Sequence, residues 1–561
     1  MEQQVNVTSV EHGTWSVPRF DRDSARRDFL IVVAGILLGG VGFWMIDREV
    51  LGLFHDDGIY AVIAKSISEG NGYRIASLPN SAFQTKYPFV YSYLLSWIWT
   101  FRPAFPENIF LLKAVNVVII VALFYLSYLF FVRNSGRAGL EGMCYAMLVC
   151  TNRVVLSFIN VTVSDLLFLL FVLLALTSYE DREFPYSKFG NPTVVAALTA
   201  LACLTRPAGV PLIVAGAVHF CWRRRYRDLL RYFSMVAILI TPWFLWQSIH
   251  ASDSNNSLFD YYLSHSYQNA AFISIWSNPI QAIDLIWANL QYLVESLDLM
   301  LMLAIIPGLN MIVYALIGLG LCVSLHKHTP AFWCFVFLYT CLLLSWPFHP
   351  VRYVVPLIPV LMLFLFRGAR RIEQLVREWA KMGEYGFGIA QSAWLPVVVI
   401  LIVTSTWVAN SLLLSDARII RGAYGQPMPY GWKGFTETFA WVRNHTEPSA
   451  VLATAYDPMY YLYTGRKAIR PALHKPETYF YPYGKAIPKV GSAGEIQAQL
   501  SSLGVDYLIV DPLDGYAEKD AELQLFEQLI RSITNAKLVF TSSDARHQVY
   551  ALRNGRISQH D

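Results

Sequence analysis

The chain has 561 residues, of which 55% are hydrophobic and 15% are charged, and its mean hydropathy is +0.39. That much apolar surface exceeds what a soluble fold can bury, so the composition excludes an ordinary soluble enzyme and indicates a polytopic α-helical membrane protein. The net charge of +4 is small and gives no indication of a nucleic-acid partner. All seven cysteines lie in apolar segments, so the sequence predicts no disulfide framework.

The first 28 residues are polar and partly acidic, and no small-residue cleavage site accompanies the apolar segment that follows them. We therefore predict that residues 1–28 form an uncleaved amino-terminal arm in the cytoplasm. Apolar stretches near the length of a spanning helix then recur through residues 29–414, and we predict about eleven spans, several of them short. These are Phe29–Ile46, Ile109–Phe131, Leu140–Phe158, Val161–Ser178, Pro192–Leu204, Ala208–Trp222, Tyr232–Ile249, Leu299–Leu325, Ala331–Trp346, Val354–Phe366 and Trp394–Leu414.

Basic residues predict the orientation of these spans, because positive charge is retained on the cytoplasmic side of a membrane. With the amino terminus inside and one crossing at each span, every basic cluster lies in the cytoplasm. A crossing by the apolar segment 88–101 would reverse this arrangement, so we predict a short interfacial or re-entrant helix there. The clusters are Arg26–Arg27, Arg133 with Arg137, Arg223–Arg227, His326–His328 and Arg367–Lys381.

Residues 415–561 follow a different pattern, in which short β-rich runs alternate with amphipathic helical patterns. We predict an α/β domain of about 145 residues. An odd number of crossings places it outside the cytoplasm, on the face of the first outer loop, residues 47–108. Strands are predicted at Val451–Ala455, Tyr507–Val510, Leu538–Thr541 and Val549–Leu552, and helices at Gly434–His445, Glu495–Leu503 and Ala517–Ile530.

Two adjacent carboxylates, Asp56 and Asp57, follow the first span directly. Carboxylates at a membrane surface are costly to desolvate and need cations or hydrogen-bond donors nearby. One interpretation is a helix amino terminus, with Asp56 as its cap and Asp57 favoured by the helix dipole. A catalytic role for one of the pair is compatible with that interpretation, and both stay open.

A second acid, Asp165, begins a span on the same outer face, where capping would also explain it. Four basic residues share that face: Lys86, Arg206, His349 and Arg352. Basic residues on the outer face are contrary to the positive-inside bias, so the position of each one needs an explanation. Snorkelling to lipid head groups is one reason. Exposed cations converging with acids indicate a phosphate site instead.

Together these motifs resemble the GT-C membrane glycosyltransferases, in particular the aminoarabinose transferases acting on lipid A, the protein mannosyltransferases and the rhizobial lipopolysaccharide sugar transferases. The resemblance covers the membrane region, and residues 415–561 resemble the periplasmic domain of many bacterial members. It implies transfer of a sugar from a polyprenyl-phosphate carrier to a lipid, glycan or protein acceptor outside the cytoplasm, here at a bacterial inner membrane. The motifs are the acidic pair, the amphipathic stretch Tyr60–Glu69, Lys86 before Pro88 and an aromatic helix, Thr205-Arg206-Pro207, and Arg352-Tyr353 before two prolines.

By this resemblance, Asp56 corresponds to the catalytic acid of the first loop and Lys86 to a lysine that contacts the carrier phosphate. Asp57 stands where relatives often have Glu. The chain departs from the aminoarabinose transferases at Tyr87, which separates Lys86 from Pro88. This departure leaves the identities of the sugar and the acceptor open.

The residue types also fit the chemistry directly. A carboxylate can remove the proton of an acceptor hydroxyl as it attacks the anomeric carbon, and we expect Asp56, kept ionised by Lys86, to do so. The leaving phosphate needs cations more than a general acid, so inversion is expected. Two acids could hold a divalent metal, but we favour a metal-free site without a cofactor.

Aromatic residues are further candidates for substrate contact, although an interfacial aromatic belt explains such residues equally well. The candidates are Tyr60, Tyr87, Tyr261 and Tyr262, with Asp165 as a polar one. Two other functions compete with the glycosyltransferase: a transporter or flippase, and a non-catalytic subunit of an envelope-assembly complex. The charged residues lie at loop edges and no repeated halves are visible, which argues against a transporter.

Overall fold

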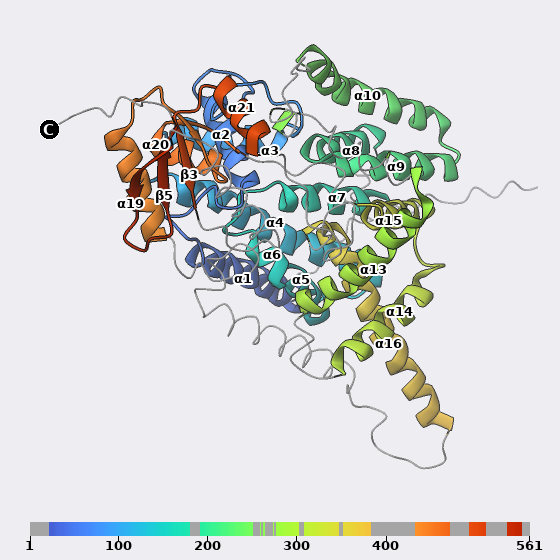
Figure 1. The fold of residues 1–561 in the computed structure, drawn as a ribbon. Helices are drawn as coiled ribbons and strands as arrows, with labels where there is room; N and C mark the ends of the chain where they lie inside the picture. The colour runs from blue at the N-terminus through green and yellow to red at the C-terminus, as the bar shows by residue number, and fades with distance from the viewer. Residues whose placement is uncertain are drawn as a thin grey trace, which may run out of the picture.

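The computed structural model describes residues 22–179, 191–250, 259, 262–263, 273, 277–301, 308–346, 352–382, 432–471, 493–511 and 536–552, and the description that follows concerns these residues. Two candidate site residues, Tyr261 and His349, lie outside them, as do the predicted span Trp394–Leu414 and the predicted helix Ala517–Ile530. Figure 1 shows a large helical region with a small sheet against one side of it.

Three helices in the described part of the chain are long and apolar enough to cross a membrane. They are residues Arg26–Trp44 of α1 (Arg22–Trp44), α4 (Ile109–Ser135) and α10 (Tyr226–Ile249). Shorter apolar helices accompany them, so the chain is a membrane helical protein, while the number of spans stays a prediction. The shorter ones include α5 (Leu140–Cys150), α7 (Asp165–Tyr179), α8 (Pro192–Thr205), α9 (Val210–Trp222), α14 (Leu309–Ser324) and α15 (Pro330–Leu344).

Two predicted spans are divided differently in the structure. The stretch Leu140–Phe158 is broken after α5, because the Asn152 side chain accepts a hydrogen bond from the Val155 amide (3.0 Å) and starts a new helix, α6 (Arg153–Ser157). The stretch Leu299–Leu325 contains the end of α13 (Pro279–Leu301) and all of α14. The segment 250–298, which separates the predicted spans Tyr232–Ile249 and Leu299–Leu325, therefore includes most of a 23-residue helix.

The helix α7 is short and almost wholly buried, and both of its ends have polar partners. Asp165 begins the helix, and the carbonyl of Thr177 near its other end accepts a hydrogen bond from Arg133 (3.4 Å). Residues 161–164, predicted as part of this span, precede the helix. The structure thus fixes a polar site at one end of α7 and a predicted cytoplasmic arginine at the other.

The first outer loop contains two helices, α2 (Asp56–Ser68) and α3 (Val90–Phe101), which pack against each other. The α3 helix also contacts α4 and α8. It coincides with the segment predicted as a short interfacial or re-entrant helix, and its 12 residues are too few to span a bilayer. A long helix, α16 (Ile358–Met382), follows the corner that carries Arg352 and packs on α14.

A five-stranded mixed sheet lies in the carboxyl-terminal part of the chain, with strand order β2-β1-β3-β5-β4. Strand β1 pairs in parallel with β2 and β3, and β5 pairs antiparallel with β3 and β4. Its members are β1 (Val451–Ala453), β2 (Lys467–Ile469), β3 (Tyr507–Val510), β4 (Lys537–Thr541) and β5 (Gln548–Ala551), with helices α19 (Trp432–His445), α20 (Asp457–Thr464) and α21 (Ala493–Ser502).

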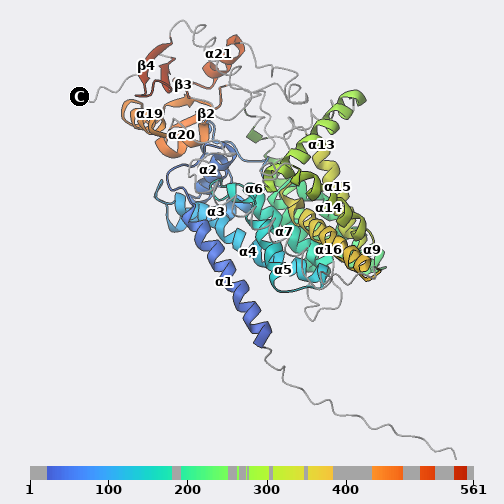
Figure 2. The ribbon, with the colours of Figure 1, turned by 90° about the horizontal axis from the view of Figure 1, so that it is seen from below.

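The four predicted strands are present: Tyr507–Val510 has the predicted bounds, and the bounds of the other three differ by one or two residues. Helix α20 and strand β2 were not predicted. Apolar side chains from α19, α20 and the sheet, among them Phe439, Leu452, Tyr460 and Val549, form its core. We call residues 432–471, 493–511 and 536–552 the sheet region. Figure 2 shows the sheet region at one end of the helical region, with α2 beside it, and α20 contacts α2.

Candidate functional site

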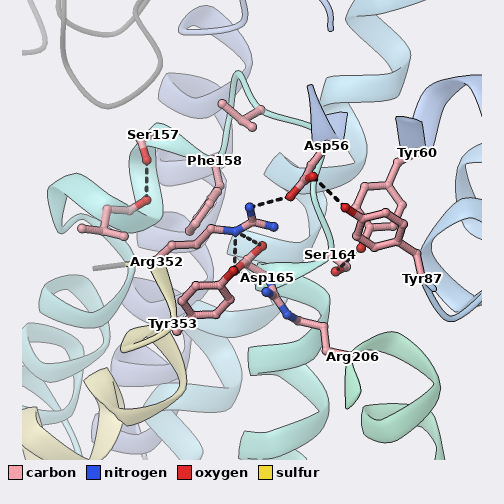
Figure 3. Close-up of polar contacts among 12 residues, drawn as sticks. Asp56, Tyr60, Tyr87, Ser157, Phe158, Ser164, Asp165, Arg206, Arg352 and Tyr353 are labelled. Atoms are coloured by element: carbon pink, nitrogen blue, oxygen red, sulfur yellow. Dashed lines mark hydrogen bonds and ion pairs between the residues drawn. The ribbon is translucent and has the colours of Figure 1, made fainter. Parts of the chain in front are cut away.

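An alternating row of acids and arginines lies where α2 and α7 begin. Arg352 donates from Nη1 to Asp56 Oδ2 (2.8 Å) and from Nε to Asp165 Oδ2 (3.1 Å) and Oδ1 (3.2 Å). Arg206 pairs with the same Asp165 carboxylate. The order Arg206, Asp165, Arg352, Asp56 joins four separate segments of the chain, and Figure 3 shows them converging. The two positive and two negative charges of these side chains cancel, so the row has no net charge.

Asp56 occupies one end of this row and lies next to the amino terminus of α2. The helix has no side-chain cap, so Asp56 does not serve the capping role that would have explained it. Its Oδ1 accepts a hydrogen bond from the Tyr87 hydroxyl (2.8 Å) and its Oδ2 from Arg352. Burial raises the pKa of Asp56, but the charge and hydrogen bond of Arg352 and the Tyr87 hydroxyl lower it to about 2.

The cation that keeps Asp56 ionised was predicted wrongly. The sequence analysis expected Lys86, whereas Arg352 has the larger effect on the pKa of Asp56 in the structure. Arg352 was also expected to be exposed, yet it is only 7% exposed and has carboxylate partners. Lipid snorkelling therefore does not explain Arg352. Its loss would remove the arginine paired with Asp56 and leave Asp165 with Arg206 alone.

Asp57 differs from Asp56 in its partners. Its Oδ2 accepts from the Gly52 amide (2.9 Å) and its Oδ1 from the Gly58 amide (2.9 Å). Burial raises the pKa of Asp57, although these two hydrogen bonds oppose the shift. The carboxylate therefore ties the loop before α2 to the first turn of the helix, which is a structural role.

Lys86 lies in a buried segment that two other parts of the chain hold in place. Trp246 and Gln247 of α10 donate to the carbonyls of Gln84 (3.0 Å) and Thr85 (2.7 Å), and the Thr85 hydroxyl donates to the Leu263 carbonyl. Burial lowers the pKa of Lys86 to about 8, and the negative charge of Asp56 opposes the shift. Lys86 is therefore a mostly charged lysine in the field of Asp56 at neutral pH.

Aromatic side chains surround the row. The Tyr60 hydroxyl is 2.9 Å from the Ser164 hydroxyl, and its ring lies 5.3 Å from that of Tyr87. The Arg352 guanidinium lies over the Phe54 ring (5.1 Å), and that of Arg206 lies over the Tyr353 ring (5.1 Å). Such contacts hold the arginines without consuming their hydrogen-bond donors.

The structure brings together most of the candidate residues but not all. Tyr60 and Tyr87 join Asp56, Asp165, Arg206 and Arg352, as Figure 3 shows. Tyr262 instead accepts a hydrogen bond from the Arg470 amide (3.1 Å) and so contacts the sheet region. Asp165 has both oxygens on arginines, so it orients cations and leaves little room for a substrate contact of its own.

Sequence reasoning missed Phe54, Ser164 and Tyr353, although each lies within two residues of a candidate. It also missed what Tyr87 does: the residue that departs from the family pattern holds the catalytic candidate. Among the described residues, no group of three or more His, Cys, Asp or Glu side chains is arranged to hold a metal ion.

The sequence matches no protein-family profile and no curated protein. Solved structures do match. ArnT from Cupriavidus metallidurans bound to undecaprenyl phosphate has a TM-score of 0.51 at 13% identity, over 94% of this chain and 98% of that chain. The apo form of ArnT gives 0.53 at 11%, over 95% and 98%. This chain has the GT-C fold.

A third structure of the same fold is the oligosaccharyltransferase AglB from Archaeoglobus fulgidus, in complex with an inhibitory peptide and a dolichol-phosphate. It aligns with a TM-score of 0.52 at 10% identity, over 95% of this chain and 75% of that chain. The GT-C fold confirms the resemblance drawn from the motifs and covers nearly the whole chain. At these identities the likeness defines the fold, and the chemistry has to be argued from the site.

Proposed function

We propose that this protein is a membrane glycosyltransferase that transfers a sugar from a polyprenyl-phosphate donor to a hydroxyl of a lipid, glycan or protein acceptor. The observation that supports this most directly is the partly buried Asp56 carboxylate, which is paired with Arg352 and acts electrostatically on Lys86. This transfer requires a general base for the acceptor proton next to cations that stabilise the leaving phosphate. The fold is that of ArnT, whose structure contains undecaprenyl phosphate.

In the proposed reaction, the acceptor oxygen attacks the anomeric carbon while its proton passes to Asp56. The bond from the anomeric carbon to the phosphate oxygen breaks, and the electron pair leaves with polyprenyl phosphate. The phosphate gains one negative charge in this step, so Lys86 and Arg352 stabilise the transition state more than the bound donor. A single displacement of this kind inverts the anomeric configuration.

The pairing of Asp56 with Arg352 affects how well Asp56 can accept a proton. A carboxylate whose pKa is about 2 is a weak base, because effective proton acceptors have a pKa nearer the working pH. A donor phosphate that binds Arg352 would neutralise part of the charge that lowers the pKa of Asp56. Donor binding would therefore make Asp56 a better base at the moment the acceptor needs one.

We place this reaction on the non-cytoplasmic face of a bacterial inner membrane, with residues 415–561 on that side. The basic clusters support this orientation. The first outer loop and the sheet region also contact each other directly, as expected if they share one face of the membrane.

The test is turnover by the purified, lipid-reconstituted protein with a panel of polyprenyl-phosphate sugars and hydroxyl acceptors. We expect release of free polyprenyl phosphate, detected by mass spectrometry, in the parent and its near-complete loss in Asp56→Asn. Movement of the intact donor across the membrane without release would instead indicate a flippase. Donor binding without either event would indicate a non-catalytic subunit.

A further inference from the structure

The loop before Asp56 is held by residues about 400 positions later in the chain. His55 Nε2 lies 3.0 Å from Oδ1 of Asp457, which is wholly buried at the start of α20. Within the described part of the chain, the other oxygen of Asp457 has no hydrogen-bond partner. A buried carboxylate with a single polar partner is unfavourable for stability, so a reason for its presence has to be sought in what the contact does.

Backbone packing brings α20 against both sides of the same loop. A methyl group added at Gly58 would lie 2.8 Å from Pro458 Cβ, and one at Gly52 would lie 2.9 Å from Met459 Cβ. These distances are shorter than any normal carbon contact. The two glycines thus allow α20 to pack closely against the amino-terminal end of α2, and the loop between them is in contact with α20 at both of its ends.

The far end of α20 holds the beginning of the loop. The Tyr463 hydroxyl accepts a hydrogen bond from the Leu51 amide (3.1 Å) and donates one to the Glu49 carbonyl. The segment 49–58, which we call the acidic loop, is therefore fixed at its start by Tyr463 and at its end by Asp457. No residue of the membrane helices supplies these two contacts.

His55 itself has a backbone conformation that requires such support. Its φ is +67°, a value that residues other than glycine rarely adopt, and it immediately precedes Asp56. A strained residue next to a reactive group persists only when its surroundings determine its conformation. The Asp457 carboxylate supplies a fixed acceptor for the His55 ring at that position.

We propose that Asp457 is a positioning residue for catalysis: it acts through His55 to hold the acidic loop, and with it the Asp56 carboxylate, in the productive geometry. This rests on the proposed function. It gives the sheet region an indirect part in the reaction, since a displacement of about 1 Å at a reacting group can cost about a hundredfold in rate.

The experiment compares Asp457→Ala with Asp457→Asn in the full-length, reconstituted protein. The Ala variant should lower kcat about 10- to 100-fold and leave the donor KM within about threefold, because the donor-binding cations remain in place. The Asn variant keeps an oxygen that accepts from His55 and should retain most of the activity. Hydrogen exchange of the acidic-loop amides, followed by mass spectrometry, should be faster in the Ala variant only.

Asp511→Ala is the matched control. Asp511 is also a buried acid of the sheet region, but its hydrogen bonds within the described residues go to Thr454, Tyr460 and His547, none of which belongs to the acidic loop. It should leave kcat and acidic-loop exchange unchanged. If it lowers kcat as much as Asp457→Ala does, the effect is general loosening of the sheet region and the proposal is wrong.

Unchanged kcat and exchange in Asp457→Ala would also overturn the proposal. If that variant does not fold, Tyr463→Phe removes the other contact and should produce faster exchange with a smaller loss of kcat. An unchanged Tyr463→Phe variant would then count against the proposal. If the parent shows no turnover with any donor, the proposed function fails, while the exchange data still decide whether Asp457 holds the loop.

Discussion

The pH dependence of donor use provides a direct test of the role of Lys86. Burial lowers its pKa to about 8, so the ammonium group is about nine-tenths charged at pH 7 and about one-tenth charged at pH 9. The charged form is the one present below the pKa. If the charge binds the donor phosphate, kcat/KM for the donor should fall about tenfold between these two pH values.

The assay is the initial rate at low donor concentration across this range, because kcat/KM reports groups of the free enzyme. Lys86→Arg places a permanently charged group there and should remove the alkaline fall, even if the plateau is lower. Lys65→Arg, the same change in α2, should retain it. Burial raises the pKa of Tyr60 to about 12, so this tyrosine stays neutral throughout. An identical alkaline fall in the Lys86→Arg variant would refute the reasoning.

Five further outcomes are expected. Asp56→Asn should lower turnover by about two to four orders of magnitude with donor binding largely retained, measured by rate and by donor titration. Asp57→Asn should instead reduce the free energy of unfolding by about 1–3 kcal/mol in thermal unfolding, because the Gly52 amide loses a charged acceptor. If Asp57→Asn abolishes turnover and Asp56→Asn only lowers stability, Asp57 is the base and Asp56 the structural acid. Arg352→Ala should destabilise the protein by about 3–5 kcal/mol, since it removes the arginine paired with Asp56 and leaves Asp165 with Arg206 alone, and Arg352→Lys by less; an unaltered melting temperature in Arg352→Ala would contradict the ion pairs. Turnover should be unchanged by EDTA, and a loss of turnover that added metal restores would contradict the metal-free site. A reporter fused to the carboxyl terminus should be active only if it functions outside the cytoplasm, and activity of a cytoplasmic reporter would contradict the predicted orientation.

Hydropathy and charge were sufficient to predict most helices, because a long apolar run in a membrane protein has few alternatives to a helix. They could not predict the break at Asn152. Asn152 is flanked by Thr151 and Arg153, a polar interruption too short to divide the run by hydropathy alone, and the side-chain cap of Asn152 decides where the helix restarts. Strand β2 and helix α20 were missed for a related reason: three and eight residues are too few for a pattern to be recognised.

In the candidate site too, the sequence predicted the position of individual residues but not the contacts between residues far apart in the chain. The sequence placed Asp56, Asp165, Arg206 and Arg352 on one face, because each lies at a predicted outer end of a span. It could not show that Arg352 lies between both acids, since 187 residues separate it from one and 296 from the other. The contact of His55 with Asp457 spans 402 residues and has no sequence signal at all.

The short α7 helix has a consequence for where the reaction takes place in the bilayer. From Thr177, next to the predicted cytoplasmic Arg133, to Asp165 the helix rises only about 18 Å, at about 1.5 Å per residue. A bilayer core is about 30 Å thick, so the acids and arginines would lie roughly 10 Å below its outer boundary unless the lipid thins there. The carrier phosphate would then descend from the head-group layer to react, with Lys86 and Arg352 replacing the water that it leaves. Membrane thickness thereby becomes a determinant of how readily the donor is used.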